Sequence, residues 1–439
     1  MRSKPLHYPR GGGNHRDAAP IRIGMAPAFD TRWVRSQFPA LNPPAGLPRE
    51  AFFDGPGGTQ VPRRAIDAVA AYLARSNANL HGAFRTSRET DHVVAEAHRA
   101  AADLLGCSER EVVFGPNMTT LTFWLSRALS RELAPGDEIV VTRLDHDANH
   151  APWMSLRERG IRVREVAFRR EDCTLDRGDL RSKLTARTKL VAVGYASNAV
   201  GTINDVAGIT REAHAVGARV FVDAVHYVPH APTDVRVLDC DFLACSAYKF
   251  FGPHQGLLYG KEEHLDRLRA FKVRPADDRL PGRLETGTQN HECMAGTAAA
   301  IDYLAELGGR CGADPAGGRR ASLVAAMTSI QAYERQLAAR LIRGLLRIPG
   351  LEFYGIADES RFDMRAPTVG IRLRDATPQE VAAELGAQGI FVWDGNFYAL
   401  NVTVDLGVED SGGLVRIGLA HYNTSGEVDR LLAALEAMD

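Results

Sequence analysis

Short apolar runs alternate with longer amphipathic segments over the first two thirds of the chain. The runs are four or five residues long: Glu111-Val-Val-Phe, Glu138-Ile-Val-Val-Thr, Val163-Arg-Glu-Val-Ala, Lys189-Leu-Val-Ala-Val, Arg219-Val-Phe-Val and Phe242-Leu-Ala-Cys-Ser. Near-continuous apolar strands separated by helices are typical of a parallel sheet covered on both faces. We therefore predict a large α/β domain over residues 28–295, with its ligand site at the carboxyl ends of the strands.

The pattern changes after about residue 296 and predicts a smaller α+β domain over residues 296–439. A Gly-rich connection is expected over residues 308–318. The expected helices and strands are Met294–Leu307, Ser322–Arg347, Leu351–Gly355, Thr368–Arg372, Pro378–Gln388, Ile390–Trp393, Leu414–Gly418 and Ser425–Met438. The last helix places Val428, Leu431 and Leu435 on one face, which should pack on a core.

Composition narrows the classes of function. The 439 residues are too many for one small core, and 45% hydrophobic with 24% charged residues is ordinary for a globular protein. A net charge of -1 gives no electrostatic case for nucleic acid, and no stretch reaches the length of a membrane span. We therefore predict neither a nucleic-acid partner nor a membrane one.

The N-terminal sequence bears on how the chain is processed, and the cysteines bear on the cellular compartment. Residues 1–27 are rich in Arg, Gly and Pro without an apolar signal-peptide core, so we predict a disordered leader or a start at Met25. The six cysteines form no C-x-x-C pair and no zinc spacing, which predicts a reduced cytoplasmic protein without a metal site.

A strand, a turn and a helix follow one another around residue 117. The turn Gly115-Pro-Asn precedes Asn117, Thr119 and Thr120 at the start of a helix with leucines at four-residue intervals. Free N–H groups and hydroxyls at a helix N-terminus can hold a phosphate. Threonines also serve as plain helix caps, so this stretch alone leaves both interpretations open.

Two charged residues stand at the ends of apolar runs. Asp223 ends Ala218-Arg-Val-Phe-Val-Asp, and Lys249 follows Phe242-Leu-Ala-Cys-Ser-Ala-Tyr. Lysine is scarce, with six among 53 basic residues, so a lone lysine between aromatic residues is conspicuous. A carboxylate for the pyridinium nitrogen and a Schiff-base amine are what a pyridoxal phosphate site needs. The residues expected at this one sheet edge are Asn117, His146, Asn198, Asp223 and Lys249.

These motifs resemble the signature of the class V pyridoxal-phosphate-dependent aminotransferase superfamily, and the chain looks like a cysteine desulfurase-like member. The carrying motifs are Val222-Asp-Ala-Val-His, Asp241-Phe-Leu-Ala-Cys-Ser-Ala-Tyr-Lys-Phe-Phe-Gly-Pro, Ser197-Asn-Ala-Val-Gly-Thr, Thr286-Gly-Thr-Gln-Asn and Arg416-Ile-Gly-Leu-Ala-His. The resemblance spans about residues 30–438. It implies aminotransferase fold type I and a homodimer with shared active sites.

The resemblance also implies roles. Lys249 would form the Schiff base with pyridoxal 5'-phosphate, Asp223 would pair with the pyridine nitrogen, and His146 would stack on the ring. Arg416 would fork onto a substrate carboxylate. His226 stands where the family often has Gln, and an acid/base role there is an open hypothesis. The other implied cofactor ligands are Met118, Thr119, Asn198, Ser246, Tyr248 and, from the partner subunit, Thr288.

Further residues are expected around the substrate. Asn198 would also lie near it. His81 in the polar segment Ser76–Arg85, and Trp393 in the aromatic loop Trp393–Tyr398, are predicted substrate-binding residues. Tyr248 stands where many members have His and resembles the kynureninase branch.

One departure from the family decides the predicted reaction. Cysteine desulfurases carry a nucleophilic cysteine on a loop shortly before the arginine strand, whereas here Trp393–Asn401 holds none and no cysteine follows Cys311. The leading hypothesis is a pyridoxal-phosphate-dependent lyase that eliminates a β-substituent, such as a C–S-linked group, from an amino acid or amino-acid conjugate without persulfide relay. The alternatives are an aminotransferase, an epimerase, a decarboxylating deaminase, or a non-catalytic scaffold.

Overall fold

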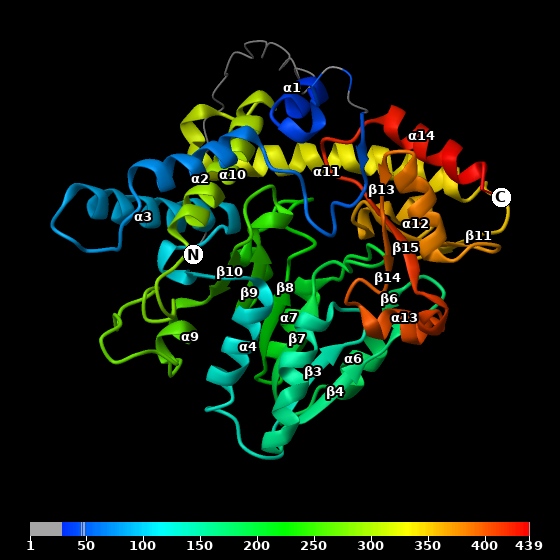
Figure 1. The fold of residues 1–439 in the computed structure, drawn as a ribbon. Helices are drawn as coiled ribbons and strands as arrows, with labels where there is room; N and C mark the ends of the chain where they lie inside the picture. Colours follow the sequence, from blue (N-terminus) through cyan, green and yellow to red (C-terminus); the bar gives the residue numbers. More distant parts are fainter. Residues whose placement is uncertain (1–28, 45, 47–48, 439) are drawn as a thin grey trace, which may run out of the picture.

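A seven-stranded sheet forms the centre of the computed structural model, which describes residues 29–44, 46 and 49–438 (Figure 1). In spatial order its strands are β2 (Val112–Gly115), β10 (Gly256–Gly260), β9 (Phe242–Ser246), β8 (Arg219–Asp223), β7 (Thr188–Gly194), β3 (Glu138–Thr142) and β4 (Arg162–Val166). Neighbouring strands are parallel except around β10, which is antiparallel to β2 and β9. The predicted α/β fold with a mostly parallel sheet is confirmed, whereas the predictions for residues 1–27 and Met25 lie outside the described residues.

Helices cover both faces of this sheet because its buried strands point apolar side chains in both directions. Val222 belongs to the core formed with α3 (Arg85–Leu105), α7 (Val206–His214) and α10 (His291–Arg310). Its neighbour Phe221 belongs to the core on the other face, formed with α4 (Met118–Leu129), α5 (Ala151–Met154) and the end of α9 (Glu262–Arg267). The alternation of side chains along one strand thus holds two helical layers in place. The short helices α6 (Arg177–Lys183) and α8 (Val235–Leu238) complete the first layer.

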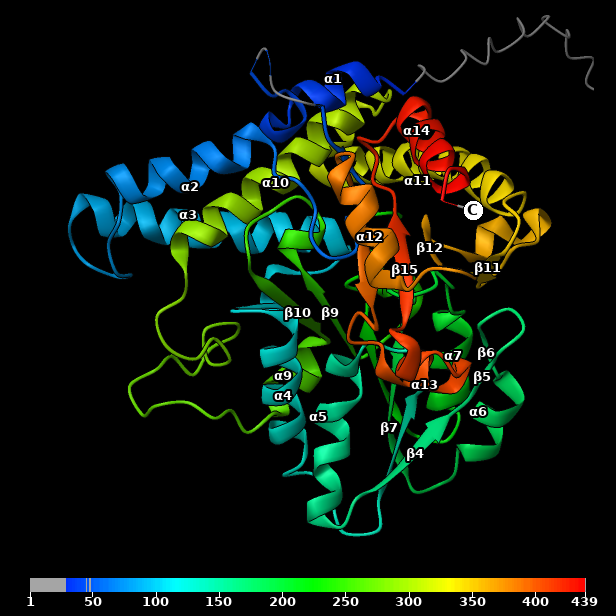
Figure 2. The same ribbon diagram turned by 45° about the vertical axis from the view of Figure 1, so that its right-hand side comes forward.

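A second sheet lies above the carboxyl edge of the first (Figure 2). Its antiparallel strands, in spatial order, are β11 (Leu351–Tyr354), β12 (Thr368–Leu373), β15 (Leu414–Gly418) and β14 (Trp393–Gly395). The helices α11 (Gly318–Leu345), α12 (Pro378–Ala387) and α14 (Ser425–Glu436) share its hydrophobic core. Capping boxes start two of them: Thr377 with Glu380 for α12, and Thr424 with Glu427 for α14.

The N-terminal part joins the two sheets. The strand β1 (Ala51–Phe52) pairs in parallel with β13 (Ile390–Phe391), and α1 (Thr31–Ser36) and α2 (Arg63–Arg75) precede α3. The predicted boundary between residues 295 and 296 falls inside α10, which packs against α2 and α3 as well as α11. The division into two domains therefore stays a prediction.

Smaller elements complete the chain. A hairpin is formed by β5 (Phe168–Arg169) and β6 (Thr174–Leu175), and α13 (Leu400–Leu406) precedes β15. The 3₁₀ helices are η1 (Pro39–Leu41), η2 (Glu109–Glu111), η3 (Asp147–Asn149), η4 (Ser155–Arg159), η5 (Ala247–Lys249), η6 (Pro315–Gly317), η7 (Glu359–Met364) and η8 (Glu409–Ser411). None of the helices described here is both long and apolar enough to cross a membrane.

Three local expectations were wrong. The run Ile390–Trp393 is not one strand, because β13 pairs with β1 while β14 pairs with β15. The segment from Trp393 is not a plain loop, because it contains β14 and leads into α13. The helix α10 continues through Gly308 to Arg310, and a β-carbon at Gly308 would overlap the Ser322 backbone, so glycine here permits close packing of α10 on α11 rather than ending the helix.

Candidate active site

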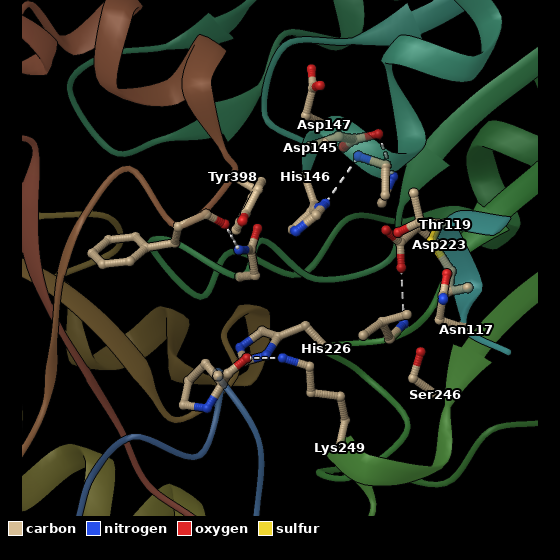
Figure 3. Close-up of a pocket in the computed structure, with 18 of the residues that line it drawn as sticks. Asn117, Thr119, Asp145, His146, Asp147, Asp223, His226, Ser246, Lys249 and Tyr398 are labelled. Carbon is tan, nitrogen blue, oxygen red and sulfur yellow. Dashed lines mark hydrogen bonds between the residues drawn. The ribbon is translucent and has the colours of Figure 1, made fainter. Parts of the chain in front are cut away.

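A cavity of about 1140 Å³ opens at the carboxyl ends of the parallel strands (Figure 3). Segments from both sheets contribute to its wall. The predicted site residues on that wall are Met118, Thr119, His146, Asn198, Asp223, His226, Ser246, Tyr248, Lys249, Trp393 and Arg416. Two predicted residues lie elsewhere: His81 is exposed and contacts Asp91, and Thr288 is exposed on a segment outside the cavity. Because Thr288 is expected to reach the site of a partner subunit, its role stays a prediction.

Asp223 forms the acidic end of the cavity. It is the last residue of β8, where it pairs in register with Gly194 of β7 and Ala244 of β9. Its Oδ1 accepts a hydrogen bond of 3.0 Å from the Val225 amide. Burial raises the pKa of Asp223 to about 6, while that amide and the charge of Lys249 act in the opposite direction. Asp223 is therefore mainly a carboxylate at neutral pH, and a cationic group beside it would stabilise this charged form.

A second buried carboxylate, Asp145, lies on the same wall and was not predicted. Its oxygens accept hydrogen bonds from the Thr142 hydroxyl at 2.6 Å, the Asn149 amide at 2.7 Å and the Gly194 N–H at 2.9 Å. Burial raises the pKa of Asp145 to about 7, and the charge of Asp223 adds to the increase. Asp145 therefore braces the segment that carries His146 against β7. Asp145 directly precedes His146, but the sequence gave no signal of this bracing role.

Lys249 ends η5 directly after β9. Its Nζ donates to the carbonyl oxygen of Pro56, in the Gly-rich turn Gly55-Pro-Gly-Gly. Burial and the positive charge of Arg416 lower the pKa of Lys249 to about 7, while Asp223 and Asp54 oppose the shift. A large share of the amine is therefore neutral and nucleophilic at neutral pH.

The N-terminus of α4 lies at the cavity, where one interpretation of the sequence placed an anion cradle. Asn117 caps the helix by accepting the Thr120 N–H at 2.8 Å, while the N–H groups of Met118 and Thr119 find no acceptor among the described residues. A β-carbon at Gly256 of β10 would overlap the backbone of Asn117 and Met118, so glycine lets the helix start approach the sheet. The Ser246 hydroxyl lines the same end of the cavity.

The His146 ring is neutral. Its Nδ1 accepts the Ala148 N–H at 3.0 Å, which leaves the ring proton on Nε2. Burial, together with the charges of Lys249 and Arg416, lowers the pKa of His146 to about 4. The ring stacks on Tyr398 with centroids 5.5 Å apart and an interplanar angle of 22°. A flat neutral face suits stacking on an aromatic ligand.

Arg416 supplies the cationic end of the cavity from β15. Its Nη1 donates to the Asn198 carbonyl oxygen at 3.1 Å, and its guanidinium lies 4.3 Å from the centroid of the Phe397 ring. Burial lowers the pKa of Arg416 to about 9, against the charge of Asp54, so it remains a cation at neutral pH. Asn198 in turn donates its Nδ2 to the Phe397 carbonyl oxygen at 2.9 Å.

His226 is a buried neutral imidazole on the opposite wall. Burial lowers its pKa well below the ordinary histidine value, and the charges of His230, Arg416 and Lys249 add to this. Its ring lies 5.3 Å from that of His230, whose Nδ1 is 2.8 Å from Glu334.

The residues present fit pyridoxal phosphate. A helix start with unused N–H groups suits its phosphate, a buried carboxylate suits its pyridine nitrogen, and a neutral lysine suits its aldehyde carbon. Three buried polar atoms of residues that line the cavity, Asn198 Oδ1, His226 Nε2 and Arg416 Nε, have no hydrogen-bond partner within the protein as described. Buried polar atoms are normally satisfied, so a polar ligand at this place would complete them. No group of three or more potential metal-ligating side chains occurs within residues 29–44, 46 and 49–438.

Part of the wall had no predicted role. Asp147, Asn396, Phe397 and Tyr398 all line the cavity. The aromatic content of residues 393–398 marked the segment as a pocket wall, but the sequence gave no signal for which side chains face inward. Glycine at position 57 allows the Trp393 side chain to pack closely, because a β-carbon there would overlap the indole nitrogen.

The chain is similar to known proteins over nearly its whole length. The model of the aminotransferase class-V family matches residues 51–313 and 320–431. An aminotransferase-like protein from Gibberella zeae is 33% identical over 421 residues, which cover 93% of this chain and 98% of the relative. A cysteine desulfurase from Serratia proteamaculans is 30% identical over 426 residues, with 93% and 98% covered.

Solved structures give the same result. The apo structure of a cysteine desulfurase from Thermococcus onnurineus superposes with a TM-score of 0.82 at 27% identity, covering 94% of this chain and 98% of the other. A cysteine desulfurase from Escherichia coli gives 0.79 at 25% identity, covering 93% and 98%. The likeness confirms the predicted type I fold.

Proposed function

The chain belongs to the aminotransferase class-V family, whose members depend on pyridoxal phosphate, and on this basis we propose that it is a lyase that removes a β-substituent from an amino acid or amino-acid conjugate. Cleavage of a C–S bond is the favoured case. The observation that carries the proposal is a half-buried Lys249 with a lowered pKa and a buried Asp223, in a cavity that Arg416 also lines and whose wall holds no cysteine among the described residues.

Each wall of the cavity has a binding task in this proposal. Lys249 would hold pyridoxal phosphate covalently at its aldehyde carbon, and Asp223 would keep a proton on its pyridine nitrogen. The N–H groups of Met118 and Thr119, with Ser246, hold the phosphate. His146 presents its neutral ring for stacking. When bound, pyridoxal phosphate supplies an electron sink for negative charge at the substrate Cα.

The remaining residues orient the substrate and move its proton. Arg416 receives the α-carboxylate through two parallel N–H groups, and its contacts with Asn198 and Phe397 fix the guanidinium plane. Lys249, once free of its covalent bond, takes the Cα proton, for which a pKa of about 7 is well suited. His226 would accept or return a proton on the other wall.

The cysteines support a reaction without persulfide relay. All six are free thiols, and none lines the cavity in the part of the chain described here. Burial raises the pKa of Cys107 and of Cys173 to about 12, and it raises the pKa of Cys240 and Cys245 as well. Since the thiolate is the nucleophile, these thiols are poor sulfur acceptors, and the sulfur would leave as a free thiol or sulfide.

The test is a substrate panel. The protein loaded with pyridoxal phosphate is incubated with cysteine, cystine and S-substituted cysteines, and pyruvate, ammonia and thiol are measured. A β-eliminating lyase forms all three from at least one substrate. Absence of all three from every substrate rejects the lyase.

Transamination is the second candidate, because one relative is an aminotransferase-like protein. Epimerisation and decarboxylating deamination use the same residues and differ in the fate of one bond. Accumulation of pyridoxamine phosphate after a half-reaction would favour transamination over elimination. A non-catalytic scaffold would give no turnover with any amino acid.

Assembly and compartment are proposed on separate grounds. A homodimer would let the exposed Thr288 of one subunit reach the phosphate site of the other, and sedimentation at micromolar concentration tests it. The six free thiols support a reducing compartment, and we place the protein in the cytoplasm.

A further inference from the structure

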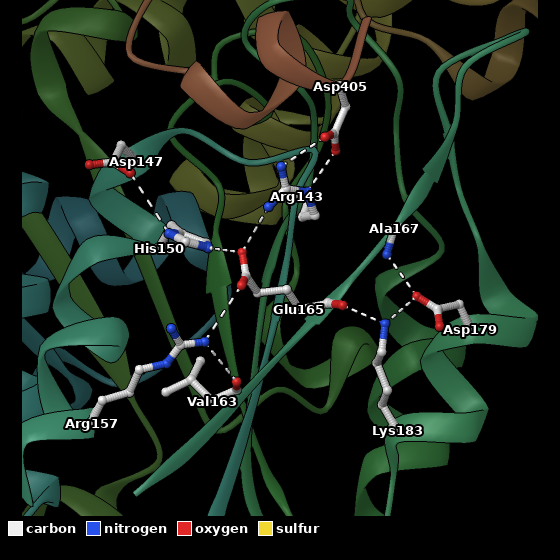
Figure 4. Close-up of polar contacts among 10 residues, drawn as sticks. All are labelled: Arg143, Asp147, His150, Arg157, Val163, Glu165, Ala167, Asp179, Lys183 and Asp405. Atoms are coloured by element: carbon white, nitrogen blue, oxygen red, sulfur yellow. Dashed lines mark hydrogen bonds and ion pairs between the residues drawn. The ribbon is translucent and has the colours of Figure 1, made fainter.

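A cluster of charged residues outside the cavity joins two segments that line it (Figure 4). Arg143 follows β3 directly and grips Asp405 of α13 with two hydrogen bonds, 2.6 Å from Nε and 2.8 Å from Nη2. Its Nη1 donates to Glu165 of β4 at 3.0 Å. The three side chains are each 25% exposed, so solvent screens this cluster less than an ordinary surface pair.

Glu165 extends the cluster to the segment that carries the stacking histidine. Its Oε1 lies 2.9 Å from His150 Nε2, and His150 directly follows η3, which starts after His146. Burial alone would raise the pKa of Glu165, but His150 and Arg143 together lower it below the ordinary value. Glu165 is therefore a stable anion that contacts both Arg143, which binds α13, and His150, which follows η3.

The turn before α13 is strained and depends on outside contacts. Phe397 and Tyr398 are two consecutive non-glycine residues with positive φ, 56° and 58°. Such conformations persist only where the surroundings hold them. Here the Phe397 carbonyl oxygen accepts from Asn198 at 2.9 Å, and the Tyr398 carbonyl oxygen accepts the Asp147 N–H at 2.6 Å.

We propose that Arg143 is a positioning residue that, through Asp405, holds α13 and thereby keeps the Phe397–Tyr398 turn against the cofactor wall. Asp405 lies seven residues after Tyr398 in the same segment, and a bidentate arginine contact restrains a helix in orientation as well as position. With the turn in place, Phe397 backs the substrate-binding Arg416 and Tyr398 covers His146. The consequence for substrate binding rests on the proposed function, whereas the consequence for the turn does not.

The test compares Asp405→Asn with a matched control, Asp429→Asn. Asp429 makes the same bidentate contact with Arg340, at 2.6 and 2.8 Å, on the outer helices away from the cavity. Asp405→Glu, which keeps the carboxylate, is the conservative rescue. Arg143→Lys, which keeps the charge without the fork, is a second variant if the first does not fold.

Two measurements are made on protein loaded with pyridoxal phosphate. Limited chymotrypsin digestion, followed by mass spectrometry, reports release of the turn through cleavage after Tyr398. In Asp405→Asn we expect cleavage there about tenfold faster than in the wild type, because local opening no longer has to break the ion pair. Steady-state kinetics should show a rise in KM of about fivefold with little change in kcat, because the bound substrate and the transition state would lose the same binding energy.

The outcomes separate the two proposals. Faster cleavage in Asp405→Asn, slowed again in Asp405→Glu and unchanged in Asp429→Asn, supports the positioning role. Equal cleavage rates in Asp405→Asn, Asp429→Asn and the wild type overturn it. If the wild type turns over no amino acid, the proposed function fails while the digestion still decides the role of Arg143.

Discussion

The floor of the cavity and its outer wall differ in how deeply their side chains are buried and in which contacts hold them. The floor consists of Asp223, the buried last residue of β8, and Lys249, which ends η5 just after the adjacent strand β9. The outer wall, residues 393–413, holds exposed aromatic side chains, with Trp393 49% and Tyr398 74% exposed. Two non-glycine residues with positive φ, Phe397 and Tyr398, and a cluster of ion pairs shape it.

The contrast separates two tasks. In the proposed function the floor holds pyridoxal phosphate, which supplies the electron sink, and burial shifts the pKa of the floor's lysine and aspartate toward neutrality. The wall presents exposed aromatic side chains at the cavity, and in the proposed function its task is to shape and select the substrate. Changes in the floor should therefore cost turnover, and changes in the wall should cost selectivity.

The largest effect should come from removing the floor amine. Lys249→Ala is expected to lower turnover by about 10³-fold or more, because no other side chain can replace the nucleophile and base. Product formation is measured beside Lys261→Ala, whose lysine pairs with Asp239 on the surface. A Lys249→Ala enzyme with a tenth of wild-type activity would remove the distinction between floor and wall.

The next largest effect should come from Arg416, where the wall meets the floor. Arg416→Lys keeps the charge but loses the planar fork, so we expect kcat/KM to fall by about 100-fold. The retained absorbance of bound cofactor serves as the control for folding. An unchanged KM for amino acids would mean that the carboxylate binds elsewhere.

A pH profile sharpens the account of the floor. Lys249 captures pyridoxal phosphate only as the free amine, so the rate of reconstitution of cofactor-free protein should rise about tenfold per pH unit below the pKa and level off above it. With its pKa lowered to about 7, the plateau should begin near neutral pH. A rate that keeps rising toward the ordinary lysine value of 10.5 would show an unperturbed amine. Stopped-flow absorbance follows the reaction.

The smallest effect should come from the wall aromatic. Tyr398→Ala removes the ring that stacks on His146, and we expect the preference for large over small S-substituents to fall about threefold to tenfold at nearly constant kcat. Tyr398→Phe keeps the ring and should behave as wild type. Loss of kcat without a change in preference would place Tyr398 in the floor instead.

The same contrast explains what the sequence could predict. The positions of Asp223 and Lys249 near the sheet edge were predictable, because Asp223 ends one short apolar run and Lys249 follows shortly after the next. Asp145 was missed, because its role depends on hydrogen bonds to Thr142, Asn149 and Gly194 that no local pattern encodes.

The wall was the least predictable part. One apolar run, Ile390–Trp393, divides between two sheets, since β13 and β14 find different partners. The ion pair between Arg143 and Asp405 joins residues 262 positions apart in the sequence. Long-range pairings of this kind leave no periodicity in the sequence.

The most direct test of the central claim is to find which lysine carries the cofactor. The protein loaded with pyridoxal phosphate is reduced with borohydride, digested, and mapped by mass spectrometry. The chain has six lysines, Lys4, Lys183, Lys189, Lys249, Lys261 and Lys272. The account predicts that the reduced cofactor is found on the peptide that contains Lys249, together with loss of the absorbance band near ~420 nm. A cofactor attached to another lysine, or to none, would contradict it.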